Sequence, residues 1–124
     1  SPEPAPAPMP PEVPNDPLQH FVEALNNRDI DSLSSLYHEN AGHVNAQRMI
    51  VGIQAIREWY DKLLHELLPA GTFAIDHVRG KGASWTFNWT FHSTSGQMAG
   101  GKDTLGLRKG RIQYHYSSFA AGRA

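Results

Sequence analysis

Hydrophobic residues recur every three or four positions in three segments of the first half of the chain, which is the spacing of one helix face. The segments are residues 17–25, 29–37 and 53–67. Asp16 is a candidate N-cap for the first segment, and Pro17 suits the first helical position because its fixed φ matches a helix. We therefore expect three helices, the third being the longest.

The hydrophobic period changes to two after Gly71, which predicts strands. Later in the chain Asp103 and Leu105 are two positions apart on one predicted strand, so they share a face. The Lys-Gly pair at 109–110 predicts a tight hairpin before the last strand. Residues 40–46 predict one earlier strand. Helices followed by antiparallel strands are typical of an α+β fold. One long predicted strand carries four aromatic residues on one face: Trp85, Phe87, Trp89 and Phe91.

Length and charge exclude several classes of protein. The chain has 124 residues, a formal net charge of -1 and no cysteine. This length suits one domain, and the charge balance gives no reason to expect a nucleic-acid partner. Without cysteine there are no disulfides or thiolate metal sites. No apolar run approaches the ~20 residues of a spanning helix, so we expect no membrane partner and a cytoplasmic location.

The first 17 residues differ in composition from the rest, because proline and alanine alternate there with few large apolar groups. Such a segment favours extended polyproline II structure, so we expect residues 1–17 to be a linker or tail. A linker would make the chain the C-terminal module of a longer protein. The alternative is a ligand for a proline-recognising domain. We expect one globular domain over residues 18–119 and a C-terminal tail over 120–124.

The order of these elements resembles a known family. Residues 18–119 are similar to the SnoaL-like polyketide cyclase and ketosteroid isomerase branch of the nuclear transport factor 2-like superfamily. The resemblance implies a cystatin-like cone, in which three helices pack on a curved antiparallel sheet around a pocket. It also implies a homodimer. Three segments carry it: ALNNRDIDSLSSLYHENA (24–41), VGIQAIREWYDKLL (51–64) and DTLGLRKGRIQYHYSSF (103–119).

The resemblance carries over one of the isomerase's three catalytic roles. The family's general base lies on the first strand, eight positions after the aromatic residue that ends the second helix; counting from Tyr37 reaches Asn45, whose amide cannot abstract a proton. The family's oxyanion-hole tyrosine corresponds to Phe21, which has no hydroxyl. The partner acid corresponds to Asp103, where the hairpin length differs from the family's.

Asp103 and His43 are the candidate catalytic residues. Asp103 should face the same side as Leu105, where burial disfavours the charged carboxylate and favours an acid that donates a hydrogen bond. The alternative is a strand-end aspartate in solvent. His43 should point to the same side of the first strand as Asn45, because the two residues are two positions apart. An imidazole that titrates near neutrality could replace the missing base. The alternative is a polar residue at a strand edge.

Six further residues are candidate ligand contacts, each with a structural alternative. The aromatic ones suit a planar apolar ligand but equally suit a core or a dimer face. The one histidine among them is more typical of a hydrogen-bonded core position. No histidine has metal-ligand spacing, so we expect neither a metal nor a cofactor. The six are Asn45, Phe21, Tyr60, Trp85, His77 and Tyr114.

Three function classes follow. The domain could bind a small, largely apolar molecule, carbonyl-containing or aromatic, in the cone. It could act on that molecule as an acid/base isomerase or cyclase. It could instead be a non-catalytic dimerisation or interaction module. The missing base and tyrosine favour binding, and the proline-rich segment with the aromatic stripe favours interaction.

Overall fold

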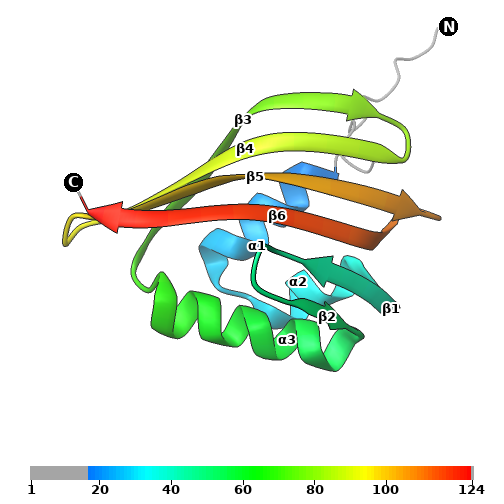
Figure 1. Ribbon diagram of the computed structural model, residues 1–124, viewed down its shortest axis with the longest axis horizontal. Helices are drawn as coiled ribbons and strands as arrows, with labels where there is room; N and C mark the ends of the chain where they lie inside the picture. Colours follow the sequence, from blue (N-terminus) through cyan, green and yellow to red (C-terminus); the bar gives the residue numbers. More distant parts are fainter. Residues whose placement is uncertain (1–16, 124) are drawn as a thin grey trace, which may run out of the picture.

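The computed structural model describes residues 17–123, and the side chains of residues 18–119. Three helices pack on one face of a curved sheet of six strands, which confirms the α+β prediction (Figure 1). The elements are α1 (Pro17–Asn27), α2 (Ile30–Ser35), β1 (Tyr37–Val44), β2 (Met49–Val51), α3 (Ile53–Lys62), its π-helical extension η2 (Leu63–Leu67), β3 (Gly71–Lys81), β4 (Ser84–Ser93), β5 (Gln97–Arg108) and β6 (Arg111–Arg123).

The sheet has the order β2-β1-β6-β5-β4-β3. All neighbouring strands run antiparallel except β1 and β6, which are parallel. The expectation of a wholly antiparallel sheet was therefore wrong at this pair. The reason is topological: the helix and the three-strand meander between β1 and β6 return the chain beside β1 in the same direction. Hydrophobic periodicity carries no information about strand direction.

The predicted first strand and the predicted C-terminal tail differ from expectation. The strand begins at Tyr37 rather than at residue 40, and it pairs with the short strand β2, which the hydrophobic pattern did not predict. β6 continues through residues 120–123, and Arg123 pairs with Gln97. The predicted tail is therefore mostly strand, because the partner β5 is long enough to pair with it. The proline-rich segment and Asp16 lie outside the described residues.

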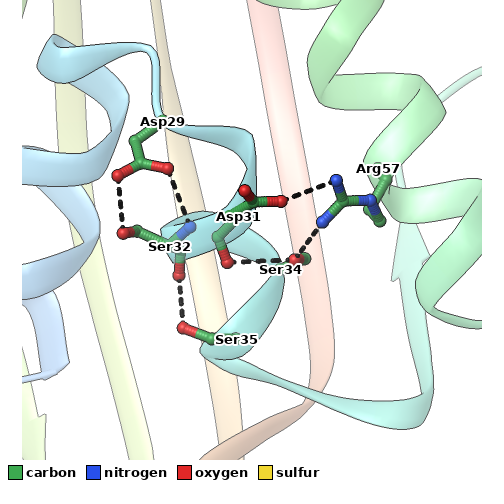
Figure 2. A network of polar contacts seen from close by, with 6 residues as sticks. All are labelled: Asp29, Asp31, Ser32, Ser34, Ser35 and Arg57. Carbon is green, nitrogen blue, oxygen red and sulfur yellow. Dashed lines mark hydrogen bonds and ion pairs between the residues drawn. The ribbon is translucent and has the colours of Figure 1, made fainter.

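Side-chain hydrogen bonds fasten α2 to α3 (Figure 2). Asp29 caps α2 by accepting hydrogen bonds from the backbone N–H and the hydroxyl of Ser32. The Arg57 guanidinium of α3 donates to the Asp31 carboxylate at 2.7 Å and to the Ser34 hydroxyl at 2.8 Å. These bonds fix α3 against α2 and so set the position of the helix that forms one wall of the cavity.

The predicted hairpin between the last two strands is confirmed. Lys109 and Gly110 both have positive φ, 53° and 81°, as a type I′ turn requires. The strands that leave this turn do not stay in simple register, because a bulge follows it on β6. Ile112 pairs with Leu107 and Tyr114 pairs with Gly106, so Gln113 has no partner on β5.

Candidate functional site

A cavity of about 250 Å³ lies between α1, the end of α3 and the inner face of the sheet. Its wall is largely apolar and aromatic, with Phe21 and Leu25 from α1, Trp59 and Leu63 from the α3–η2 segment, and Trp89 from β4. This is the composition of a site for a small apolar molecule. Its polar side chains come from β1, the turn that follows it, α3, β5 and β6.

Asp103 is the most completely hydrogen-bonded of these polar residues. It is 5% exposed, which agrees with the predicted inward direction on β5. Its Oδ1 accepts hydrogen bonds from Trp89 Nε1 at 2.9 Å and from Ser117 Oγ at 2.8 Å. Its Oδ2 lies 2.6 Å from Nε2 of His115. Both oxygens are thus held by the protein, so the Asp103 carboxyl is not a free hydrogen-bonding group in the cavity.

Two tyrosines continue this arrangement. Nδ1 of His115 lies 2.7 Å from the hydroxyl of Tyr37, which lies 2.6 Å from the hydroxyl of Tyr60. We call Asp103, His115, Tyr37 and Tyr60 the polar row. Burial raises the pKa of both tyrosine hydroxyls, and for Tyr37 the neighbouring Tyr60 raises it further. Both tyrosines therefore remain protonated hydrogen-bond donors, and Tyr60 brings the row to the cavity wall.

His43 lies against the row without joining it. Its ring centroid is 4.2 Å from that of His115, and Nδ1 is buried with no hydrogen-bond partner among the described residues. Burial lowers the pKa of His43 to about 2, and repulsion from His115 adds to this. The expectation of an imidazole titrating near neutrality is therefore wrong. A neutral His43 is a weak base but a usable hydrogen-bonding group in the cavity wall.

Three of the predicted ligand contacts line the cavity. Phe21 is buried in the wall and packs edge-on against Phe87 and His115. Tyr60 ends the polar row there. Asn45 lines the cavity mouth, but its Oδ1 accepts the backbone N–H groups at 47 and 48, which fixes the turn after β1. Asn45 therefore shapes the mouth more than it offers a free polar group.

The family model for the SnoaL-like domain matches residues 18–115. The chain belongs to the SnoaL-like domain family. None of the curated proteins compared with it matches.

Solved structures share the fold of this SnoaL-like domain. A candidate isomerase of the SnoaL-like family from Agrobacterium tumefaciens is 23% identical, with a TM-score of 0.70 over 84% of this chain and 94% of that one. A candidate ketosteroid isomerase from Kribbella flavida is 12% identical, with a TM-score of 0.72 over 90% and 80%. An NTF2-like protein of unknown function from Cytophaga hutchinsonii is 14% identical, with a TM-score of 0.69 over 85% and 88%. At these identities the likeness confirms the nuclear transport factor 2-like fold alone.

Three other predicted contacts of the SnoaL-like domain lie outside the cavity, two of them because of bulges. On β3, two residues oppose one on β4 between Asp76 and Arg79, and His77 has a φ of 52° there. This turns His77 to solvent, where it contacts the Asp76 carboxylate. On β6, the bulge at Gln113 turns Tyr114 outward, and it is 45% exposed.

Trp85, which was predicted as part of the cavity wall, lies outside the cavity for a different reason. It keeps the inward parity of Phe87 and Trp89, and it is partly buried against the core. However, its Nε1 donates to the carbonyl of Gly82, at the end of β4 away from the cavity. Trp89 takes the predicted place in the wall, because the cavity lies nearer the other end of the strand.

His115 is a member of the polar row that the sequence did not predict as a site residue, and so is Tyr37. Strict alternation from Ile112 puts Tyr114 and Tyr116 inside and His115 outside. The bulge reverses this, so that Ile112, His115 and Ser117 are all buried. The glutamine at the bulge gives no sequence signal. Within residues 17–123 no three His, Asp or Glu side chains are grouped to hold a metal ion, and no helix is long and apolar enough to cross a bilayer.

Proposed function

We propose that the cavity binds a small, largely apolar molecule that carries a carbonyl oxygen, and that the domain acts on it as an acid/base isomerase or cyclase. The observation that supports this most directly is the polar row, which connects a buried carboxylate to a hydroxyl in a largely apolar cavity wall. Buried polar groups that converge on an apolar cavity are typical of a ligand site.

The polar row has two hydrogen-bond directions. When His115 carries one proton, on Nε2, its Nδ1 accepts from Tyr37, which in turn accepts from Tyr60. When His115 carries two protons, Nδ1–H donates to Tyr37 and Tyr37 donates to Tyr60. The proton of Tyr60 is then free for a ligand oxygen. A proton taken up at His115 thus becomes a donor at the cavity wall, while Asp103 balances the charge.

Such a donor would stabilise the negative charge that develops on a carbonyl oxygen during enolisation, while solvent water in the cavity accepts the proton that leaves the α-carbon. Enolisation is the step that the isomerisation of an unsaturated ketone shares with an aldol-type cyclisation. The two tyrosines suit this role because their raised pKa values keep them protonated. Neutral His43 of β1, which also lines the cavity, would add a second hydrogen bond to the ligand.

The test is proton exchange at the α-carbons of 2-tetralone in D₂O, followed by NMR. The wild-type domain should accelerate exchange, and Tyr60→Phe should slow it by about 10²-fold. Tyr116→Phe is the matched control, since Tyr116 lies on the outer face of β6 and is 46% exposed; it should exchange at the wild-type rate. Exchange no faster than in buffer, or unchanged in Tyr60→Phe, would contradict the catalytic role. Saturable quenching of tryptophan fluorescence by 2-tetralone measures binding separately.

Self-association is a second candidate function, since Tyr114 and Tyr116 are exposed side by side along the outer face of β6. Aromatic residues with polar ends are typical of protein interfaces. We propose a homodimer through this face. Light scattering should then give twice the monomer mass for the wild type and the monomer mass for the Tyr114→Ser, Tyr116→Ser double variant. A wild-type monomer at micromolar concentration would contradict it.

A further inference from the structure

Two cationic side chains stand at the mouth of the cavity. Arg48 lies in the turn between β1 and β2, and Lys62 ends α3. Both line the cavity and both are exposed. Neither forms an ion pair with another described residue. The mouth therefore carries two positive charges that the protein itself does not neutralise.

Arg48 is held at the mouth by the backbone and by an aromatic ring rather than by an acid. The backbone N–H groups of Gln47 and Arg48 donate to Asn45 Oδ1 at 2.8 and 3.1 Å, and the N–H of Asn45 donates to the carbonyl of Arg48 at 2.9 Å. The guanidinium carbon lies 5.8 Å from the centroid of the Trp59 ring, which also lines the cavity. Stacking of this kind orients the guanidinium and leaves its N–H groups free.

Lys62 has possible acidic partners on its own helix but does not use them. Glu58, four residues earlier, accepts a hydrogen bond from Gln54 at 3.2 Å instead. Asp61 faces His65, with Oδ1 and Nδ1 3.1 Å apart. The i,i+4 pair of Glu58 and Lys62 that the sequence suggests is thus absent from the described residues. Lys62 thus lines the cavity with no described acid paired to its charge.

Among the described residues that line the cavity, the one acidic residue is Asp103. Its two oxygens are occupied by Trp89, Ser117 and His115, so it is not available to pair with a charge at the mouth. The described lining therefore combines an apolar wall with an unopposed positive rim. Clefts lined by one sign of charge concentrate ligands of the opposite sign.

We propose that the ligand is an amphipathic carboxylate, whose apolar body fills the cavity and whose carboxylate binds Arg48 and Lys62 at the mouth. This rests on the proposed function, since it assumes that the cavity binds a small apolar molecule, and it adds the chemical class of that molecule. Arginine suits this contact because its planar fork matches a carboxylate. With the carboxylate held outside, the opposite end of the ligand is directed toward Tyr60 and His43.

The experiment compares 2-naphthoate with 2-naphthamide, which have the same aromatic body but differ in charge. Binding is followed through the fluorescence of Trp59 and Trp89, which line the cavity, and by calorimetry. The naphthoate should bind the wild type about tenfold more tightly. The Arg48→Gln, Lys62→Gln double variant should bind both compounds with the affinity that the wild type shows for the amide.

The Arg79→Gln, Lys81→Gln double variant is the matched control. Both residues are exposed at the end of β3, do not line the cavity, and their loss changes the net charge by the same amount. This control should keep the wild-type preference for naphthoate. Equal wild-type affinity for the two compounds, a preference that survives Arg48→Gln, Lys62→Gln, or an equal loss in the control would overturn the inference. Failure of both compounds to bind would overturn the proposed small-molecule function and this inference with it.

Discussion

Nε2 of His115 lies 2.6 Å from Oδ2 of Asp103, with the two side chains only 1% and 6% exposed. The contact runs diagonally across two strands, because His115 pairs with Leu105 and Asp103 pairs with Ser117. The position of the polar row therefore depends on the pairing register of β5 and β6. Any change to this pair should affect both the sheet and the cavity.

Replacing Asp103 by alanine should lower the free energy of unfolding by about 3–5 kcal/mol, because it leaves buried donors on Trp89, Ser117 and His115 without their acceptor. Urea unfolding measures this. Asp76→Ala is the control: Asp76 also faces a histidine, but the pair is exposed, so the loss should be at most about 0.5 kcal/mol. Similar losses in the two variants would show that the buried pair contributes no more to the free energy of unfolding than the exposed pair.

Tyr37→Phe should interrupt the polar row while it keeps the aromatic packing. It removes the partner of His115 Nδ1 and of the Tyr60 hydroxyl, so stability should fall by about 1–3 kcal/mol. Exchange of 2-tetralone protons should slow about as much as in Tyr60→Phe. Wild-type exchange in Tyr37→Phe, alongside slow exchange in Tyr60→Phe, would mean that Tyr60 works without the row.

His43 should make the fold sensitive to acid. Its pKa is about 2 in the folded chain, against an ordinary value of 6.5, because of burial and then repulsion from His115. Below about pH 6.5 the unfolded chain binds a proton there and the folded chain does not, so stability falls as the pH falls toward 2. Above that range the effect is absent.

The measurement is urea unfolding of the wild type and of His43→Gln from about pH 7 to about pH 4. The wild type should lose up to about 1.4 kcal/mol per pH unit more than the variant. His92→Gln, which changes an exposed histidine on β4, should follow the wild type. Parallel curves for the wild type and His43→Gln would mean that burial does not suppress protonation of His43.

Gly101→Ala should disturb the site through the backbone. A Cβ at this position would collide with the carbonyl of Ser118 on β6 and lie 2.9 Å from Nε1 of Trp89. The variant should lose about 1–3 kcal/mol and shift the tryptophan emission, because Trp89 must move away from Asp103. At Gly106 the nearest atom would be 3.6 Å away, so Gly106→Ala is the control and should be close to neutral. Unchanged emission in Gly101→Ala would contradict this account.

The sequence predicts the elements well where local chemistry determines them. Pro17 begins α1 and the Lys-Gly pair forms the last turn, because each residue stabilises its own local geometry. Asp103 also faces inward as expected, since β5 keeps strict alternation from Asp103 to Leu105. The family resemblance predicts the cone shape, which depends on the order of the elements more than on any one residue.

The prediction of side-chain direction fails where a bulge adds a residue to a strand. His77 and Tyr114 each lie at or next to a bulge, and in both cases the residue expected inside faces solvent. A bulge depends on how two strands fit each other, so neither strand's own sequence reveals it. The same error hid His115, although its residue type alone made it a candidate for proton chemistry.

The unpaired Gln113 is one residue more than β6 needs to pair with β5. Its removal would restore simple alternation along β6 and would leave every later side chain on its present face, because Gly106 already pairs with Tyr114 and Leu105 with His115. His115 and Ser117 would stay inside the cone, and Tyr114 and Tyr116 would stay outside. The lining of the cone therefore tolerates a difference of one residue in the length of its last strand. Two chains of this fold can share the same lining although alternation counted from the hairpin assigns them opposite faces.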